Sequence, residues 1–261
     1  MIPMEKALPL RERIHRRELV CGTWINTLHD PRLVRMIAAC GFDFVSLDME
    51  HSAVSLETLS LECMTARLCG LHPLVRSSEP LNFKKNGLLM DLGAGGLIVP
   101  DVESAEMAEQ SVRSIRFLGG GTRGYAAQDI RSGFRGFRAE DMRSADREAV
   151  AVIQIESREG VAHVDEILSV EGVDVVVVGR GDLAKDMGLP CEQNHPRVAE
   201  AVERVCEAAA RHGVCAGLMC PDAEKAREMI QKGARFLHYS NEQALLTERY
   251  RNFTDGMRTR P

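Results

Sequence analysis

The sequence has few of the features that mark membrane, secreted or nucleic-acid-binding proteins. No apolar run approaches the roughly 20 residues that a membrane-spanning helix needs. The start of the chain, MIPMEKALPLRERIHRRELV, is charged and has no uninterrupted apolar segment of the signal-peptide kind. There is no long run of Lys and Arg, and the formal net charge is −5, which gives little electrostatic support for nucleic acid or an anionic membrane as a partner. We therefore expect a cytoplasmic protein whose partner is neither nucleic acid nor a membrane.

Paired cysteine motifs are also missing. The chain has eight cysteines, but they are scattered and no Cys-x-x-Cys pair occurs, which argues against a structural zinc site. Most lie in apolar or helical contexts, where reduced cysteine behaves as a small hydrophobic residue. No linker, charge block or low-complexity segment divides the chain. We therefore interpret residues 1–261 as a single domain.

The chain does contain a regular alternation of short apolar runs and amphipathic segments. The runs are often β-branched and are typical of strands buried on both faces of a parallel sheet. They cover residues 20–26, 42–48, 72–77, 96–102, 149–156, 173–179, 214–220 and 235–240. Between them, apolar residues recur with helical spacing. Many of these segments begin at Ser, Asp or Pro and end at Gly, as in 31–41, 55–70 and 195–213.

This alternation predicts an α/β fold, a single (β/α)₈ TIM barrel. An open doubly wound sheet is the alternative, but it usually has a glycine-rich phosphate turn after its first strand, and GTWINTLHDP is not one. The irregular region 118–148 is too long and too polar for a plain connector, so we interpret it as a functional loop. Its arginines form either a solvated face or a binding site for a second substrate carboxylate: Arg123, Arg131, Arg135 and Arg138.

Ionisable and amide side chains collect where the expected strands end, which is where (β/α)₈ barrels carry their active sites. At these ends lie Asp48, Glu50, His51, Arg76, Gln154, Glu156 and Asp182. Gln154 and Glu156 are two residues apart on one strand and therefore share a face. Two carboxylates and an imidazole within four positions, at the end of a buried strand, indicate proton transfer.

Each of these residues also has a structural alternative. Glu156 and Asp182 suit a hard divalent cation, but Glu156 could instead pair with Arg158 or Arg180, and Asp182 could cap a helix. A histidine at a strand end is often bonded to a backbone carbonyl, although neighbouring carboxylates favour its protonated form and suit a general base.

Arg76 is open to two interpretations as well. A guanidinium at the rim fits a carboxylate or an enolate oxygen, but it could equally be a structural ion-pair partner.

An ordered set of motifs adds to this interpretation. LDMEH, PLVR, MDLGAGGLIVPDVESAEMA, TRGY, QIES and VGRGDLAKDMG, across about residues 22–239, together resemble the HpcH/HpaI aldolase family of the phosphoenolpyruvate/pyruvate superfamily. The resemblance implies a metal-dependent (class II) aldolase, a carbon–carbon lyase that cleaves 4-hydroxy-2-oxo or 2-keto-3-deoxy acids to pyruvate and an aldehyde. It also implies Mg²⁺ as cofactor, with Mn²⁺ or Co²⁺ as alternatives, and a homo-oligomer, commonly a hexamer in which the last helix packs on a neighbouring subunit.

The same resemblance implies roles in binding. Glu156 and Asp182 would bind the metal, and Arg76 would hold the keto or enolate oxygen. Gln154 would assist that oxygen or a metal-bound water. The backbone amides of Gly181 and Asp182 would hold the pyruvate carboxylate.

Further roles concern proton transfer and the wall of the pocket. His51 would be the base or proton relay, oriented by Asp91. Asp48 and Glu50 would support the site from behind or lie at a subunit contact, and Trp24, the only tryptophan, would line the pocket.

This mechanism agrees with the chemistry of retro-aldol cleavage. A base removes the C4 hydroxyl proton, and an electron sink stabilises the C3 carbanion. A divalent cation beside Arg76 would be that sink. Lys185 does not lie at an expected strand end, which argues against a Schiff-base mechanism.

The chain departs from the family pattern around the distal end of the substrate. It has FLGGGTRGY in place of a Pro-Pro-containing turn, SSEPLNF after Arg76, and Gly-Arg-Gly-Asp at 179–182 where many members have Gly-Pro-Ala-Asp. The substrate is therefore left open. Citrate-synthase-like condensation of oxaloacetate with an acyl thioester, oxaloacetate decarboxylation with carbon–carbon bond formation, and a non-enzymatic binding barrel are the alternatives.

Overall fold

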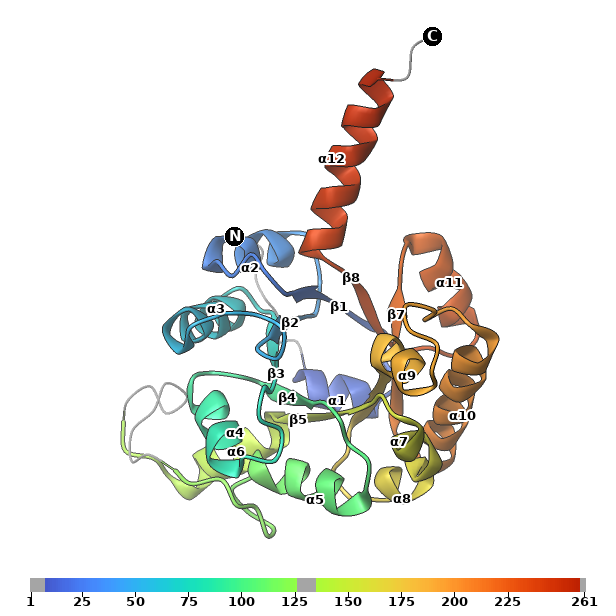
Figure 1. Ribbon diagram of the computed structural model, residues 1–261. Helices are drawn as coiled ribbons and strands as arrows, with labels where there is room; N and C mark the ends of the chain where they lie inside the picture. Colours follow the sequence, from blue (N-terminus) through green and yellow to red (C-terminus); the bar gives the residue numbers. More distant parts are fainter. Residues whose placement is uncertain (1–7, 126–134, 259–261) are drawn as a thin grey trace.

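The structure, a computed structural model, describes residues 8–125 and 135–258, and its centre is a closed barrel of eight parallel strands (Figure 1). The strands follow one another round the barrel in sequence order and are β1 (Val20–Ile25), β2 (Phe44–Asp48), β3 (His72–Arg76), β4 (Gly96–Val99), β5 (Val150–Ile155), β6 (Val175–Val178), β7 (Cys215–Cys220) and β8 (Phe236–Asn241). Pairing of β1 with β8 closes the ring. The predicted (β/α)₈ barrel is confirmed.

The described helices lie outside the barrel, and most of them surround it (Figure 1). They are α1 (Leu10–His15), α2 (Pro31–Ala39), α3 (Leu56–Leu68), α4 (Phe83–Asp91), α5 (Ala105–Ser114), α6 (Ala139–Glu148), α7 (Arg158–Ala162), α8 (Val164–Leu168), α9 (Arg180–Asp186), α10 (Pro196–His212), α11 (Ala223–Gln231) and α12 (Glu242–Arg258). None of the described helices is long and apolar enough to span a bilayer.

Local sequence explains where several helices begin and end. The Asp30 side chain accepts a hydrogen bond from the backbone N–H of Arg32 and so caps α2, and Ser55 caps α3 in the same way. α10 begins with Pro196 and ends at Gly213, whose φ of 72° is left-handed. The helices expected within residues 31–41, 55–70 and 195–213 are therefore confirmed.

The barrel interior is filled with side chains. Phe44 stacks on Phe236 with ring centroids 4.4 Å apart, and both are fully buried. Gly22 leaves room for this pair, because a Cβ at that position would lie 2.2 Å from the Phe44 ring. A second apolar layer, which includes Leu59 and Leu97, lies between the strands and the helices. Since the interior is packed, ligands have access only at the ends of the barrel.

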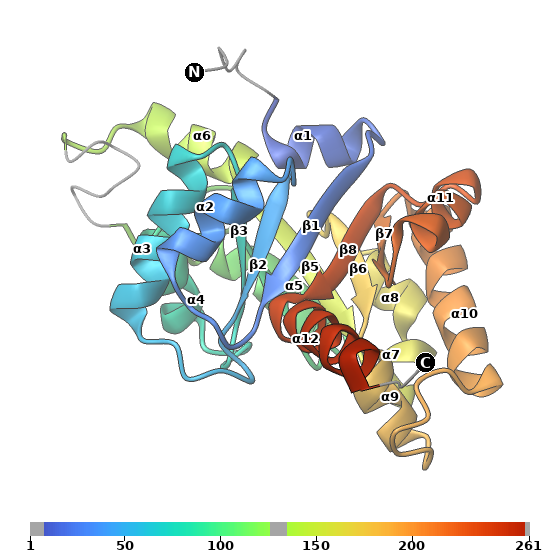
Figure 2. The same ribbon diagram turned by 90° about the horizontal axis from the view of Figure 1, so that it is seen from above.

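The two ends of the barrel differ. Figure 2 shows α1 at one end and α9 and α12 at the opposite end, which is where the strands terminate. The arm formed by α12 projects away from the barrel in Figure 1, and among its residues only Glu242 is buried.

The irregular region 118–148 is partly regular. Its last third is helix α6, and residues 126–134, with Arg131, lie outside the described part of the chain. Arg123 pairs with Asp91 and lies 4.2 Å from the Phe117 ring, and its side chain is buried, so it does not belong to a solvated face. Arg135 and Arg138 are exposed enough for such a face, but both pair with Asp141.

Candidate active site

A cavity of about 600 Å³ opens at the C-terminal end of the barrel. Residues at the ends of several strands line it, among them Trp24, Arg76, Gln154, Gly179, Arg180 and His238. This is the end at which (β/α)₈ barrels place their reacting groups.

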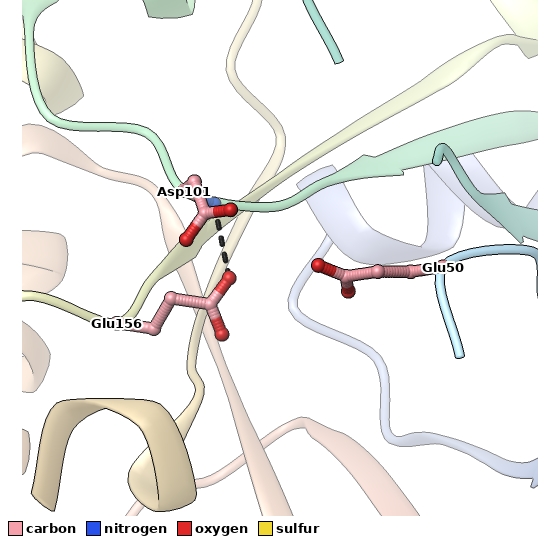
Figure 3. Close-up of side chains that lie close together, drawn as sticks. All are labelled: Glu50, Asp101 and Glu156. Atoms are coloured by element: carbon pink, nitrogen blue, oxygen red, sulfur yellow. Dashed lines mark hydrogen bonds between the residues drawn. The ribbon is translucent and has the colours of Figure 1, made fainter. Parts of the chain in front are cut away.

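Three carboxylates meet beside this cavity. Glu50, Asp101 and Glu156 come from the ends of different strands, and each offers an oxygen within 4.8 Å of the others (Figure 3). Glu156 accepts hydrogen bonds from the Gln154 side chain at 2.6 Å and from the backbone N–H of Asp101 at 2.9 Å. In Figure 3 the Glu50 carboxylate faces this pair from the other side. Such a set of oxygen atoms suits a hard divalent cation.

Glu156 is the most perturbed member of the group. Its side chain is buried, and among the described residues no cationic group lies within 4.0 Å of its carboxylate. Burial raises the pKa of Glu156 to about 7. The negative charges of Asp101 and Glu50 raise this pKa further, and the two hydrogen bonds that Glu156 accepts lower it only in part. A positive ion placed there would reverse this shift.

Arg76 is held beside these carboxylates by two ion pairs. Its Nε and Nη2 donate to the Asp48 carboxylate at 2.9 and 2.7 Å, and its Nη1 lies 3.0 Å from Glu50. Register places Asp48 and Arg76 side by side on β2 and β3. Burial would raise the pKa of Asp48, but the hydrogen bonds from Arg76 hold it below the usual range. Arg76 is therefore both an ion-pair partner and a residue of the cavity wall.

Aromatic rings position the other side of Arg76. Its guanidinium carbon lies 5.0 Å from the centre of the Trp24 ring, and Trp24 in turn stacks on His238 at 5.0 Å. Burial lowers the pKa of His238 to about 3, so this histidine is neutral, and its Nε2 lies 2.9 Å from the Ser46 hydroxyl. Trp24 lines the cavity, as the resemblance implies.

Asp182 lies outside the three-carboxylate group. Its side chain is half-exposed, in the first turn of α9, and is 3.5 Å from Lys185. It does not cap this helix, because the N-cap position belongs to Gly179. The start of α9 nevertheless touches Glu156: a Cβ on Gly179 would lie 2.1 Å from the Glu156 Oε2.

The proposed structural partners of Glu156 are engaged elsewhere. Arg158 pairs with Asp186 at 3.0 Å, and Arg180 donates to the Asn194 side chain at 3.0 Å. The alternative in which one of these arginines neutralises Glu156 is therefore wrong.

Comparison with known proteins identifies the family. The model of the HpcH/HpaI aldolase/citrate lyase family matches residues 21–248. The chain belongs to this family. It is 32% identical over 244 residues to a hydroxypyruvate/pyruvate aldolase of Delftia acidovorans, which covers 93% of this chain and 89% of that protein. It is 31% identical over 223 residues to a 5-keto-4-deoxy-D-glucarate aldolase of Shigella boydii, with 85% of each chain covered.

Solved structures of the family share the whole fold. An HpcH/HpaI aldolase from Desulfitobacterium hafniense superposes with a TM-score of 0.91 at 31% identity and 98% coverage of both chains. The citrate synthase SbnG superposes with a TM-score of 0.85 at 27% identity and 97% coverage of both. The present HpcH/HpaI family member is thus a class II aldolase, a carbon–carbon lyase.

The predicted base lies at the rim of this aldolase site. The His51 side chain is exposed, and its Nε2 is 3.7 Å from the Glu50 carboxylate. Asp91, the predicted orienting residue, is bonded to Arg123 instead. Within one subunit the structure therefore brings His51 to Glu50 rather than to Asp91, and the role of Asp91 stays a prediction.

Sequence reasoning missed Asp101. The apolar run predicts one strand over residues 96–102, but β4 ends at Val99, and Asp101 follows with a left-handed φ of 55°. Asp tolerates this conformation better than most residues do. The signal was available, because Pro100 ends the strand and a carboxylate comes directly after it.

Proposed function

We propose that this aldolase cleaves, and in reverse forms, the C3–C4 bond of a 4-hydroxy-2-oxo or 2-keto-3-deoxy acid, with pyruvate or a close analogue and an aldehyde as the products. The observation that carries the proposal is the buried carboxylate of Glu156, which has no cationic group within 4.0 Å among the described residues, although the charge of Arg76 acts on it from farther away. The relatives named as hydroxypyruvate/pyruvate and 5-keto-4-deoxy-D-glucarate aldolases support it.

The residues at this site fit a divalent cation. Their donor atoms are carboxylate oxygens, and the raised pKa of Glu156 indicates a carboxylate that lacks a positive neighbour. Glu156 and Asp182 would hold the ion, with Asp101 and Glu50 close by. We propose Mg²⁺, with Mn²⁺ or Co²⁺ as substitutes. When bound, the cation withdraws electron density from the substrate's keto oxygen and so stabilises the developing enolate.

Arg76 contributes directed hydrogen bonds to the same oxygen. A guanidinium has five N–H donors, and three of those of Arg76 face Asp48 and Glu50. The remaining donors are available to the keto oxygen, and the two carboxylates and Trp24 fix the direction in which they point. Gln154 lines the same cavity, and its amide would bind the same oxygen or a nearby water. This arrangement needs no reorganisation as negative charge develops.

His51 would transfer the protons. In cleavage it removes the C4 hydroxyl proton, the C4–O bond becomes the aldehyde carbonyl, and the electrons of the C3–C4 bond pass into the enolate. Protonation of C3 then completes pyruvate. The Glu50 carboxylate at 3.7 Å stabilises the imidazolium that forms in between.

We also propose that the chain forms a homo-oligomer, in line with the hexamers common in its family. The α12 arm exposes Leu246, Tyr250, Phe253 and Met257 at helical spacing, away from its own barrel. An apolar stripe of this kind is typical of a helix that packs on another subunit. Light scattering of the full chain and of a Tyr250→Ser, Phe253→Ser variant tests this: a smaller assembly in the variant supports the proposal, and a monomeric wild type contradicts it.

The function is tested by coupling pyruvate release to lactate dehydrogenase across a panel of 4-hydroxy-2-oxo acids, with and without EDTA. We expect release that EDTA abolishes and that added Mg²⁺ or Mn²⁺ restores. If no keto acid yields pyruvate and metal makes no difference, the proposal fails. The similarity to SbnG supports a second candidate, condensation of oxaloacetate with an acyl thioester. Release of free coenzyme A from acetyl-CoA and oxaloacetate, measured in parallel, decides between them.

A further inference from the structure

Glu242, the buried first residue of α12, binds the loop that follows β1. Its side-chain oxygens accept hydrogen bonds from three successive backbone N–H groups, those of Asn26 at 3.0 Å, Thr27 at 2.6 Å and Leu28 at 3.0 Å. Glu242 is only 6% exposed. Successive N–H groups that converge on one carboxylate form an anion-binding concavity. The loop 26–28 is therefore shaped around this side chain.

The side chain of the first loop residue reaches the active site. The Nδ2 group of Asn26 donates to Asp48 Oδ2 at 3.1 Å, and the same oxygen accepts a hydrogen bond from Arg76 Nη2 at 2.7 Å. Asn26 and Arg76 both line the active-site cavity, and Asp48 is fully buried behind them. A continuous series of hydrogen bonds thus runs from Glu242 through Asn26 and Asp48 to the guanidinium of Arg76.

The far end of the same loop has an anchor of its own. The Nδ1 atom of His29 lies 3.0 Å from the carboxylate of Glu62 on α3, and both side chains are buried. Among the described residues, neither of these two is bonded to Asp48. The loop therefore remains attached to the barrel when Glu242 is changed, and the effect of that change should be concentrated at Asn26.

We propose that Glu242 is a positioning residue for the aldolase reaction, which acts through Asn26 and Asp48 to fix the direction of the Arg76 guanidinium. The inference rests on the proposed function, in which Arg76 donates to the oxygen that becomes the enolate oxygen. That hydrogen bond strengthens as negative charge develops, so a misdirected guanidinium slows enolate formation more than it weakens pyruvate binding. Glu242 is not among the residues that line the cavity, and it acts only through other side chains.

The variant Glu242→Gln tests this with little change in shape. Its amide keeps one acceptor oxygen, which can still bind the N–H groups of Thr27 and Leu28. Its NH₂ group replaces the oxygen that lies nearest to the Asn26 N–H, so two donors face each other there. The variant therefore disturbs the loop at the residue whose side chain reaches Asp48.

The kinetic test follows the exchange of pyruvate methyl protons in D₂O by NMR, with full-length enzyme and saturating Mg²⁺. This exchange needs no aldehyde: a C3 proton leaves, the electrons of its C–H bond pass into the enolate, and a deuteron returns to C3. We expect Glu242→Gln to lower kcat about tenfold, because small errors in the placement of a catalytic group are costly, and to change KM less than threefold. A kcat within twofold of wild type would overturn the inference, as would a loss confined to KM.

A double-mutant cycle distinguishes positioning from general support of the loop. If Glu242 acts through Asn26, its replacement matters little once the Asn26 side chain is gone. We therefore expect Glu242→Gln to lower kcat less than twofold in an Asn26→Ala background. A tenfold loss in both backgrounds would overturn the inference.

The neighbouring residue of α12 provides a matched control. Gln243 donates to the Thr27 hydroxyl at the exposed surface of the same loop. Gln243→Ala should leave kcat unchanged, because this contact does not lead to Asp48. Urea unfolding of every variant accompanies the kinetics. A Glu242→Gln protein with a lower free energy of unfolding but a wild-type kcat for its folded fraction would show a purely structural role.

A measurement without catalysis separates this inference from the proposed function. In a crystal structure of Glu242→Gln, we expect the distance from Asn26 Nδ2 to Asp48 Oδ2 to exceed the hydrogen-bonding limit of about 3.5 Å. If the wild type exchanges no pyruvate protons yet the variant shows this displacement, the proposed function fails and Glu242 still positions Asp48 and Arg76. A contact that stays at 3.1 Å in the variant overturns the inference whatever the activity.

Discussion

Asp174 and Glu156 are carboxylates of similar burial at opposite ends of the same barrel, and they have opposite surroundings. Asp174, just before β6, is 3% exposed and is bonded to Arg11 at 2.9 Å, His15 at 2.7 Å and the backbone N–H of Ala151 at 2.9 Å. Glu156, just after β5, is 5% exposed and accepts hydrogen bonds from one amide and one backbone N–H, and no cation lies within 4.0 Å of it in the part of the chain that the structure describes.

The difference separates stability from function. Asp174 joins α1 to the base of the barrel, and Arg116 lies 3.5 Å away on its other side, so its charge is compensated within the chain. Glu156 has no ion-pair partner within 4.0 Å among the described residues, so a bound cation would supply the missing counter-charge. A buried carboxylate without an ion-pair partner therefore indicates which end of the barrel holds the active site. This burial is stronger evidence than the position of Glu156 in the sequence.

The largest expected effect is on catalysis. Glu156→Gln keeps the shape of the side chain and one of its two accepted hydrogen bonds but removes its charge. We expect kcat/KM for pyruvate release to fall about 1,000-fold or more, since electrostatic stabilisation by a cation contributes several kcal/mol to the transition state. Steady-state assays with saturating Mg²⁺ measure this. A loss smaller than tenfold would place the chemistry elsewhere.

The matching change at the other end should affect folding instead. Asp174→Asn leaves the charges of Arg11 and Arg116 without their buried partner. We expect the free energy of unfolding in urea to fall by about 3 kcal/mol, while kcat of the folded fraction stays within a few-fold of wild type. If Glu156→Gln destabilises the protein more than Asp174→Asn does, the contrast between the two ends is wrong.

The pH dependence of stability follows from the raised pKa of Glu156. Without metal, this carboxyl binds its proton more tightly in the folded state, with a pKa near 7, than at its ordinary value of 4.5. Its contribution to stability is therefore fully present below about pH 4.5 and is lost as the pH rises to about 7, a loss of up to about 3 kcal/mol. Urea unfolding of metal-free protein from pH 5 to pH 8 should show this loss in wild type but not in Glu156→Gln.

Cation binding should show the reverse trend. Because the ion displaces the proton of Glu156, we expect the affinity for Mn²⁺ to rise about tenfold per pH unit up to pH 7 and to level off above it. Calorimetric titration at several pH values measures this. An affinity that does not change between pH 5 and pH 7 would show that Glu156 is not a ligand.

The smallest expected effect concerns Asp101. Asp101→Asn tolerates the left-handed backbone and keeps the N–H that bonds Glu156, but it removes one charge from the group. We expect affinity for Mn²⁺ to fall about tenfold, in the range seen when groups around a metal site are removed. Glu103→Gln, two residues along and outside the three-carboxylate group, is the charge-matched control and should leave the affinity unchanged.

The fold could be predicted from the sequence because the signals for each strand and helix lie within short segments of the chain. Apolar runs of strand length, such as that of β5, alternate with capped amphipathic helices such as α10, and only a few architectures accept that order. The gathering of Arg76, Gln154 and Glu156 followed from the same rule, since the C-terminal ends of parallel strands lie together.

What could not be predicted depends on contacts between distant residues. The burial of Arg123 comes from its pairing with Asp91, 32 positions earlier, and the partner of Arg180 is an asparagine on the loop before α10. Asp101 was missed because β4 is three residues shorter than the apolar run that contains it. The spacing of residues along the sequence does not predict such pairings, because they depend on how far each side chain extends in the folded structure.

Gly179 has a consequence for any effort to redesign this enzyme. A methyl group there would collide with the Glu156 carboxylate, whereas the next side chain along, Arg180, extends into the cavity wall. The two adjacent positions therefore tolerate substitution differently. Position 179 must remain glycine for the enzyme to stay active, whereas position 180 can be varied. A library built at position 180 alone would vary the wall of the cavity while leaving the Glu156 carboxylate in place.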